Sequence, residues 1–112
     1  MKRSSPQRIK DIKENVNKII ANTENISEEE FYENDVLYSA VLRWLEIIGE
    51  AAKYVTQEIK DKYSEVPWKE MAAMRDVATH DYADLVHKRI WETIVRDIPK
   101  LKEEIEKIES PS

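Results

Sequence analysis

The chain contains no cysteine and a single glycine, and these scarcities exclude several kinds of protein at the outset. Without cysteine there is no disulfide, no thiolate nucleophile and no zinc site built on sulfur ligands. One glycine and four prolines are too few for the many tight turns of a β-sheet protein. No apolar run reaches membrane-spanning length, and no signal-peptide core follows Met1. We therefore expect a soluble, cytoplasmic protein that does not interact with membranes.

The composition favours long amphipathic helices. Apolar residues make up 41% and charged residues 37% of the 112 positions, which suits helices with one buried and one solvated face. We expect a single helical domain over 1–112, with frayed ends near 1–4 and 109–112. The formal net charge of −5 argues against a general nucleic-acid binder, because non-specific affinity for phosphates comes from lysine and arginine. Any contact with nucleic acid must be local.

Capping residues predict where the first helices begin. The first helix should start near Pro6, with Ser5 as its cap, and fade at 22–25. Ser27 and Glu30 have the spacing of a capping box, which predicts a short second helix.

A long central helix is expected from Val36, capped by Asn34 or Asp35, to about 62–65, because apolar residues keep helical spacing throughout this stretch. Gly49 lies in its middle, where glycine costs about 1 kcal/mol relative to alanine. A close helix crossing would explain a glycine at this position.

Two more helices should follow, one opened by Pro67 and one interrupted by a kink at Pro99. Between them, residues 81–86 suit either a tight loop or continued helix. The three tryptophans occur at helical spacing and are predicted to be core residues rather than platforms for stacked bases: Trp44, Trp68 and Trp91. The predicted fold is all-α, an antiparallel bundle of four to five helices.

The stretch RDVATHDY, residues 75–82, contains the candidates for chemistry. In the plainest interpretation His80 is a hydrogen-bonded helix-end residue and Arg75 a surface ion-pair partner. In a metal-binding interpretation His80, Asp84 and His87 stand at i, i+4 and i+7 and present ligands together. Against a metal, the chain has no further histidine and no His-Glu-x-x-His motif.

A third interpretation is acid–base chemistry on RNA. Histidine can accept and return a proton near neutrality, and arginine holds phosphate through a planar fork of donors. RNA brings its own nucleophile, the 2′-hydroxyl, so that a base, an acid and a cation would suffice without a metal or other cofactor. Five helical residues turn through about 140°, so Arg75 and His80 share a face only if the helix breaks or a second chain completes the site. A two-fold homodimer would double each group around one cleft.

Other polar residues near the octet have helical spacings that suggest supporting roles. Asp76 and His80, at i and i+4, share a face, so that Asp76 could orient the imidazole. Arg75 and Tyr82, at i and i+7, also face the same way. On the central helix, Arg43, Glu46 and Glu50 lie on or next to the apolar stripe, and Arg43 and Glu50 are seven residues apart on one face. These residues could form a buried or interfacial ion pair, or position Arg75 or His80.

Three segments together resemble a known family. They are RWLEIIGEAAKYV at 43–55, VPWKEMAAMRDVATHDY at 66–82 and IWETIVRDIPKLKEEIEKI at 90–108. Their order and spacing resemble the HepT-like branch of the HEPN superfamily over about residues 8–108. The resemblance implies an all-helical homodimer in which each protomer gives Arg75 and His80 to a metal-independent ribonuclease site at the subunit interface.

The resemblance also implies a partner and a modification. Such proteins are toxins of two-gene toxin–antitoxin systems, and the antitoxin is a small nucleotidyltransferase resembling MntA. That partner is understood to transfer AMP from ATP to the tyrosine two residues after the histidine, here Tyr82. Added phosphates would put negative charge where RNA phosphate must bind.

An alternative from another class is a non-catalytic nucleotide-binding or interaction module that acts only through a nucleotidyltransferase partner. The acidic net charge favours it. So does the departure after Tyr82, where the family often has Phe-Gly and this chain has Ala83 and Asp84. RNA cleavage, with a histidine variant as control, separates the two hypotheses.

Overall fold

The computed structural model describes residues 4–79 and 84–108, without the side chains of 77–79 and 84–87. These residues form helices and contain no β-strand. The helices are α1 (Ser5–Thr23), α2 (Glu28–Glu33), α3 (Asp35–Lys53), α4 (Gln57–Lys62), α5 (Trp68–Thr79), α6 (Asp84–Glu92), the π-helical η1 (Thr93–Asp97) and α7 (Ile98–Ile105). The all-helical class expected from the composition is therefore confirmed.

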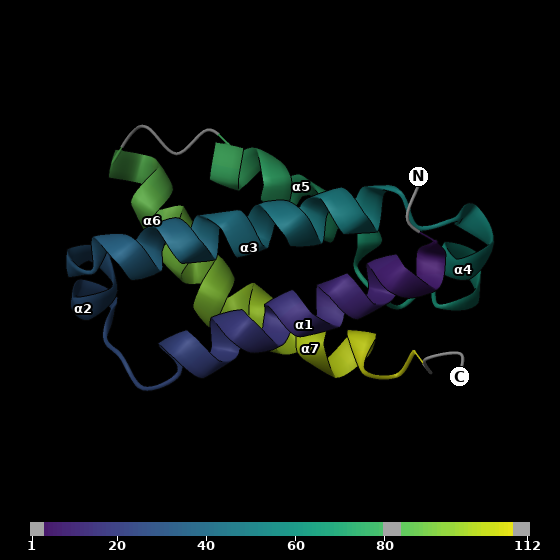
Figure 1. Cartoon of the computed structure of the whole chain (residues 1–112), viewed down its shortest axis with the longest axis horizontal. Helices are drawn as coiled ribbons and strands as arrows, with labels where there is room; N and C mark the ends of the chain where they lie inside the picture. The colour runs from purple at the N-terminus through teal and green to yellow at the C-terminus, as the bar shows by residue number, and fades with distance from the viewer. Residues whose placement is uncertain (1–3, 80–83, 109–112) are drawn as a thin grey trace.

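The long helices pack side by side around α3. In Figure 1, α3 lies between α5 on one side and α1 on the other, and α7 lies along α1. The chain runs through α1, α3 and α5 in alternating directions, as in an antiparallel bundle, and the short helices α2 and α4 lie at opposite ends of the long axis (Figure 1). None of the helices in the described ranges is both long and apolar enough to cross a membrane.

Local side-chain hydrogen bonds explain where the first helices begin. Ser4, rather than the predicted Ser5, caps α1, because its hydroxyl accepts from the backbone N–H of Gln7 while the Gln7 side chain accepts from Ser4 N–H. Ser4 thus has a defined place, although it fell within the stretch expected to fray. The capping box of Ser27 and Glu30 is confirmed. These hydrogen bonds with Ser27 also lower the pKa of Glu30.

The predicted central helix is in fact two helices. Asn34 caps α3 as expected, but α3 ends at Lys53, and a separate helix, α4, begins at Gln57. The break arises because Thr56 adopts an extended conformation and its hydroxyl accepts the N–H of Ile59, as an N-cap does. The apolar spacing continues across the break because α3 and α4 both contribute side chains that pack against the core. The sequence pattern therefore did not reveal the break.

The last helical stretch is irregular next to the predicted kink. Pro99 lies in the first turn of α7 and has no N–H to offer the preceding turn. The chain adapts through η1, where the N–H of Ile98 bonds to the carbonyl of Thr93, five residues back. The interruption expected at Pro99 is present as a π-helical segment that begins before the proline.

The core is formed mainly by aliphatic side chains from α1, α3, α5, α6, η1 and α7, with Phe31 added from α2. Its fully enclosed members include Ile12, Val16, Ile19, Val41, Leu45, Ile48, Met71, Ile98, Leu101 and Ile105. The expected placement of the tryptophans is confirmed: Trp68 is buried and donates its indole N–H to the carbonyl of Tyr63, while Trp44 and Trp91 are partly buried against the core. Each therefore contributes packing area.

Some predictions fall on residues that the structure does not describe. The frayed ends at 1–3 and 109–112 lie outside the described residues. The connection at 81–86 lies outside them as far as residue 83, after which α6 begins.

Candidate functional site

The centre of the site is the crossing of α3 and α5 at Gly49. A Cβ atom added to Gly49 would lie 2.6 Å from the backbone N of Arg75, 2.7 Å from its Cβ and 3.1 Å from the carbonyl O of Ala72. Real Cβ contacts are not this short, and two of the three neighbours are backbone atoms that cannot rotate away. The close crossing expected from this glycine is confirmed, and the residue at the point of contact is Arg75.

The side chain of Arg75 is paired with the neighbour of that glycine. Its Nη1 lies 3.1 Å from Oε2 of Glu50, and the two side chains are 45% and 44% exposed. Arg75 therefore contacts α3 at two places: its backbone packs against Gly49, and its guanidinium pairs with Glu50. This arrangement directs a permanently charged donor group toward solvent on one face of the bundle.

Arg43 has a different partner from the one its spacing suggested. Its Nη1 lies 2.6 Å from Oε1 of Glu46, three residues along α3. The Arg43 side chain is 65% exposed, so this pair is at the surface rather than buried. Glu50 contacts Arg75 and Arg43 contacts Glu46, so the two expected supporting residues lie on one face of α3 with separate partners.

Arg75 lies at one side of a groove with a volume of about 380 Å³. The groove runs across three helices and is lined by Arg8 and Asp11 from α1, by Arg43, Glu46, Ile47, Glu50 and Ala51 from α3, and by Arg75 from α5. We call it the arginine groove. The sequence singled out its charged residues on α3 and α5 but not Arg8 or Asp11, because no local spacing relates α1 to α5.

The remaining predicted residues are only partly placed. Asp76 is exposed on α5, next to Arg75. The proposed acid–base residue His80 and the tyrosine Tyr82 lie outside the described residues. So do the side chains of Asp84 and His87, although both residues belong to α6. Among the described side chains no group of three or more His, Cys, Asp or Glu is placed to hold a metal.

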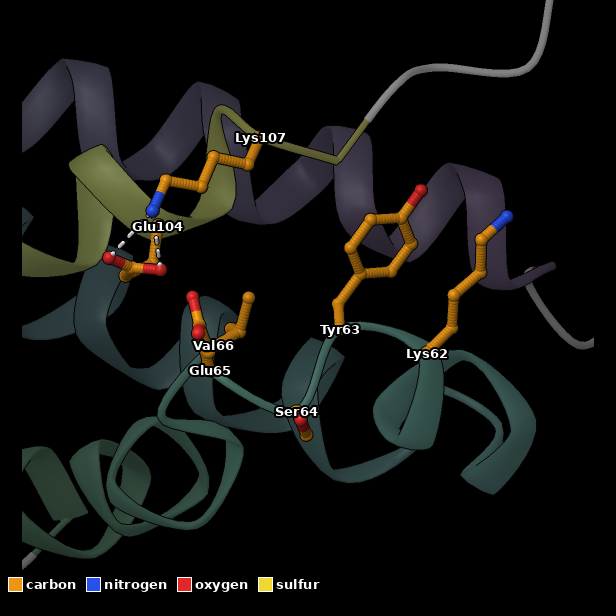
Figure 2. A pocket seen from close by; sticks show the side chains of 7 residues that line it. All are labelled: Lys62, Tyr63, Ser64, Glu65, Val66, Glu104 and Lys107. Carbon is orange, nitrogen blue, oxygen red and sulfur yellow. Dashed lines mark hydrogen bonds and ion pairs between the residues drawn. The ribbon is translucent and has the colours of Figure 1, made fainter.

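A second pocket, of about 220 Å³, lies away from these residues, between the α4–α5 connection and the end of α7 (Figure 2). Its lining includes two lysines, Lys62 and Lys107. The Nζ of Lys107 lies 3.2 Å from each carboxylate oxygen of Glu104, and this hydrogen bonding raises the pKa of Lys107. Because Lys107 is already paired with Glu104, which lines the same pocket, we do not include this pocket in the candidate functional site.

The fold and the site define a class of protein: a small helical bundle that holds an arginine, exposed to solvent, at a close helix crossing. Comparison with known proteins gives the family. Residues 12–108 match the HepT-like family, described as ribonuclease HepT-like, and the chain belongs to this family. The resemblance inferred from three sequence segments is thereby confirmed.

Individual relatives cover nearly the same length. The chain is 41% identical over 108 residues to a protein of Thermococcus cleftensis named Probable ribonuclease HepT, covering 96% of this chain and 98% of that protein. It is 40% identical over 96 residues to Putative RNase MJ1380 of Methanocaldococcus jannaschii, covering 86% and 88%. It is 44% identical over 90 residues to Putative RNase TTE0752 of Caldanaerobacter subterraneus subsp. tengcongensis, covering 80% of each. No solved structure gives a significant match to the chain.

Proposed function

We propose that this protein is a metal-independent endoribonuclease that acts as the toxin of a toxin–antitoxin pair. The observation that carries the proposal is the placement of Arg75, fixed by the Gly49 crossing and by Glu50 yet still half exposed beside a groove. A guanidinium fixed in this way is suited to binding a substrate phosphate, because it is already oriented before the substrate binds and little conformational entropy is lost on binding. Its membership of the HepT-like family supports RNA as the substrate.

In the proposed reaction the RNA supplies the nucleophile. A base removes the proton of the 2′-hydroxyl, the resulting oxyanion attacks the adjacent phosphorus, and the bond to the 5′-oxygen breaks as an acid returns a proton to it. The products are a 2′,3′-cyclic phosphate and a 5′-hydroxyl. His80 is the base or the acid, and Arg75 stabilises the extra negative charge on the phosphorus-bound oxygens. In a homodimer, His80 of one protomer would serve as base and that of the other as acid.

Two carboxylates have supporting roles in this proposal. Glu50 is a positioning residue that holds the Arg75 guanidinium, as their 3.1 Å contact supports. Asp76 precedes His80 by four residues and orients the imidazole. Neither residue is proposed to contact RNA.

The test is cleavage of a mixed pool of single-stranded RNA and tRNA by the purified full chain in the presence of a chelator. Arg75→Ala and His80→Ala should each lower the cleavage rate by at least about 100-fold, the typical loss for one charge-stabilising or proton-transfer group. Glu50→Ala should lower kcat less, and Glu50→Gln, which can still accept a hydrogen bond from the guanidinium, should recover part of the loss.

The control is the circular dichroism and molecular mass of each variant, which should match those of the wild type. Cleavage that persists in both Arg75→Ala and His80→Ala would refute the assignment, and loss of cleavage with the chelator would indicate a metal site. A wild-type protein that leaves every RNA uncut while binding a nucleotidyltransferase would identify a non-catalytic interaction module.

We further propose that a nucleotidyltransferase antitoxin resembling MntA neutralises the protein by transferring AMP from ATP to Tyr82. The first transfer forms a bond between the tyrosine oxygen and the α-phosphorus of ATP, the phenol gives up its proton, and pyrophosphate leaves. Any further AMP is added to the AMP already attached. The attached phosphate would repel RNA from the neighbouring Arg75 and His80. Incubation with the partner and ATP should raise the mass by whole AMP units, and Tyr82→Phe should remain unmodified. Modification mapped to Tyr54 or Tyr63 would contradict the assignment.

A further inference from the structure

The arginine groove is unusual for this chain because its described lining contains arginine and no lysine. Three of the six arginines of the sequence line it, one from each of α1, α3 and α5, whereas no lysine within the described ranges does. Arginine presents a planar fork of donors that matches phosphate geometry, while lysine offers a single hydrated charge. In a chain with a net charge of −5, this is a local concentration of the side chain best suited to binding phosphodiesters.

From these placements we infer that the arginine groove binds backbone phosphates of the RNA next to the bond that is cut, with Arg43 and Arg8 as the contacts beyond Arg75. This inference rests on the proposed ribonuclease function and extends it to residues outside the RDVATHDY octet. Because α3 lies between α5 and α1 (Figure 1), a strand that contacts Arg75 on α5 and Arg8 on α1 would cross α3, the helix that carries Arg43.

The groove also contains carboxylates, and the pairing of two of them, Glu46 and Glu50, is compatible with this role. Arg43 and Glu46 form an exposed i,i+3 pair, of a kind that contributes little to stability. A phosphate can therefore replace or share the carboxylate at small cost. The Arg75–Glu50 pair is also exposed to solvent, with 45% and 44% of the two side chains accessible, so a phosphate arriving from solvent can compete with the carboxylate for the guanidinium.

Arg8 is held in place by an aromatic ring. Its guanidinium carbon lies 4.9 Å from the ring centroid of Tyr54, the C-cap residue that follows α3. The Tyr54 side chain is half exposed, so this contact orients the guanidinium without burying it. The resulting surface has a defined cation on α1 and another on α3, both lining the same groove as Arg75.

The experiment measures binding of a labelled single-stranded RNA oligonucleotide to the full chain carrying His80→Ala, so that binding is separated from cleavage. Arg8→Ala and Arg43→Ala should each weaken binding several-fold. Each should also reduce the slope of log K against log salt by about 0.7, the value for one phosphate contact on a single strand. Glu46→Gln should tighten binding, because it removes the carboxylate that competes with phosphate for Arg43. Arg96→Ala, an exposed arginine on η1 outside the groove, is the matched control and should leave affinity and slope unchanged.

The outcomes separate this inference from the proposed function. If the wild type cleaves RNA but the Arg8 and Arg43 variants bind with the same affinity and salt slope as Arg96→Ala, the groove inference is wrong and the nuclease stands. If the wild type cleaves no RNA but binds it in a way that depends on Arg8 and Arg43, the nuclease is wrong and the groove stands. Equal effects of Arg43→Ala and Glu46→Gln would identify a merely structural ion pair and overturn the inference.

Discussion

At the scale of single residues, Gly49 determines where Arg75 can be. A glycine in the middle of a helix is unfavourable by about 1 kcal/mol relative to alanine, so its presence needs a compensating contact. The structure supplies one, since the backbone of Arg75 occupies the space that any Cβ would take. The same contact places the Arg75 guanidinium within reach of Glu50, the residue that follows Gly49 on α3.

Gly49→Ala should therefore destabilise the protein despite the better helix propensity of alanine. Relieving contacts of 2.6 and 2.7 Å requires α5 to move away from α3, and such overpacking typically costs about 1–3 kcal/mol. Urea unfolding followed by circular dichroism should show a lower midpoint, and RNA cleavage should fall as Arg75 moves. Ser39→Ala, on an exposed position of the same helix, is the control and should leave stability unchanged or slightly higher. A Gly49→Ala protein as stable as the wild type would show that the crossing tolerates a methyl group.

At the scale of elements, local chemistry predicted the helix starts well and one helix end badly. The capping box at Ser27, the cap at Asn34 and the helix opened by Pro67 depend on residues three or four positions apart, so they can be read from the sequence. The end of α3 could not, because Val55 and Ile59 keep the apolar spacing of a continuous helix while packing against the core from two segments.

The choice of ion-pair partner shows the same limit. Arg43 and Glu50 lie seven residues apart on α3 and were plausible partners on helical geometry alone. The structure instead pairs Arg43 with Glu46, the nearer acid on its own helix, and gives Glu50 to Arg75 from the neighbouring helix. Helical spacing lists the possible partners, but only the crossing of α3 and α5 decides among them.

At the scale of the whole molecule, the proposed mechanism needs more than one chain. Five residues separate Arg75 from His80, a turn of about 140° on a continuous helix, so the two groups would share one helical face only if the helix broke or a second chain completed the site. A two-fold dimer resolves this by bringing both copies of each residue to a shared cleft. We therefore propose that the active species is a homodimer.

The prediction concerns both mass and subunit mixing. Light scattering of the full chain should give twice the 13.2 kDa of one protomer. When wild-type chains are unfolded and refolded with an excess of chains that carry both Arg75→Ala and His80→Ala, the cleavage rate per wild-type chain should fall, because a mixed dimer keeps only one of the two histidines that the mechanism uses. Refolding the same amount of wild type alone is the control. A monomeric mass, or a rate per wild-type chain that the excess variant does not change, would rule out a site shared between protomers.

The sequence by itself determined the helical class, most helix starts, the need for a close crossing at Gly49 and the resemblance to the HepT-like family, because each of these depends on residue type and short-range spacing. Only the tertiary structure decided that Arg75 is the residue against Gly49, that Glu50 is its partner, and that Arg8 lines the same groove. These relations join residues on different helices. Their distances follow from how the helices cross, and the crossings are set by the packing of the whole core rather than by any local pattern.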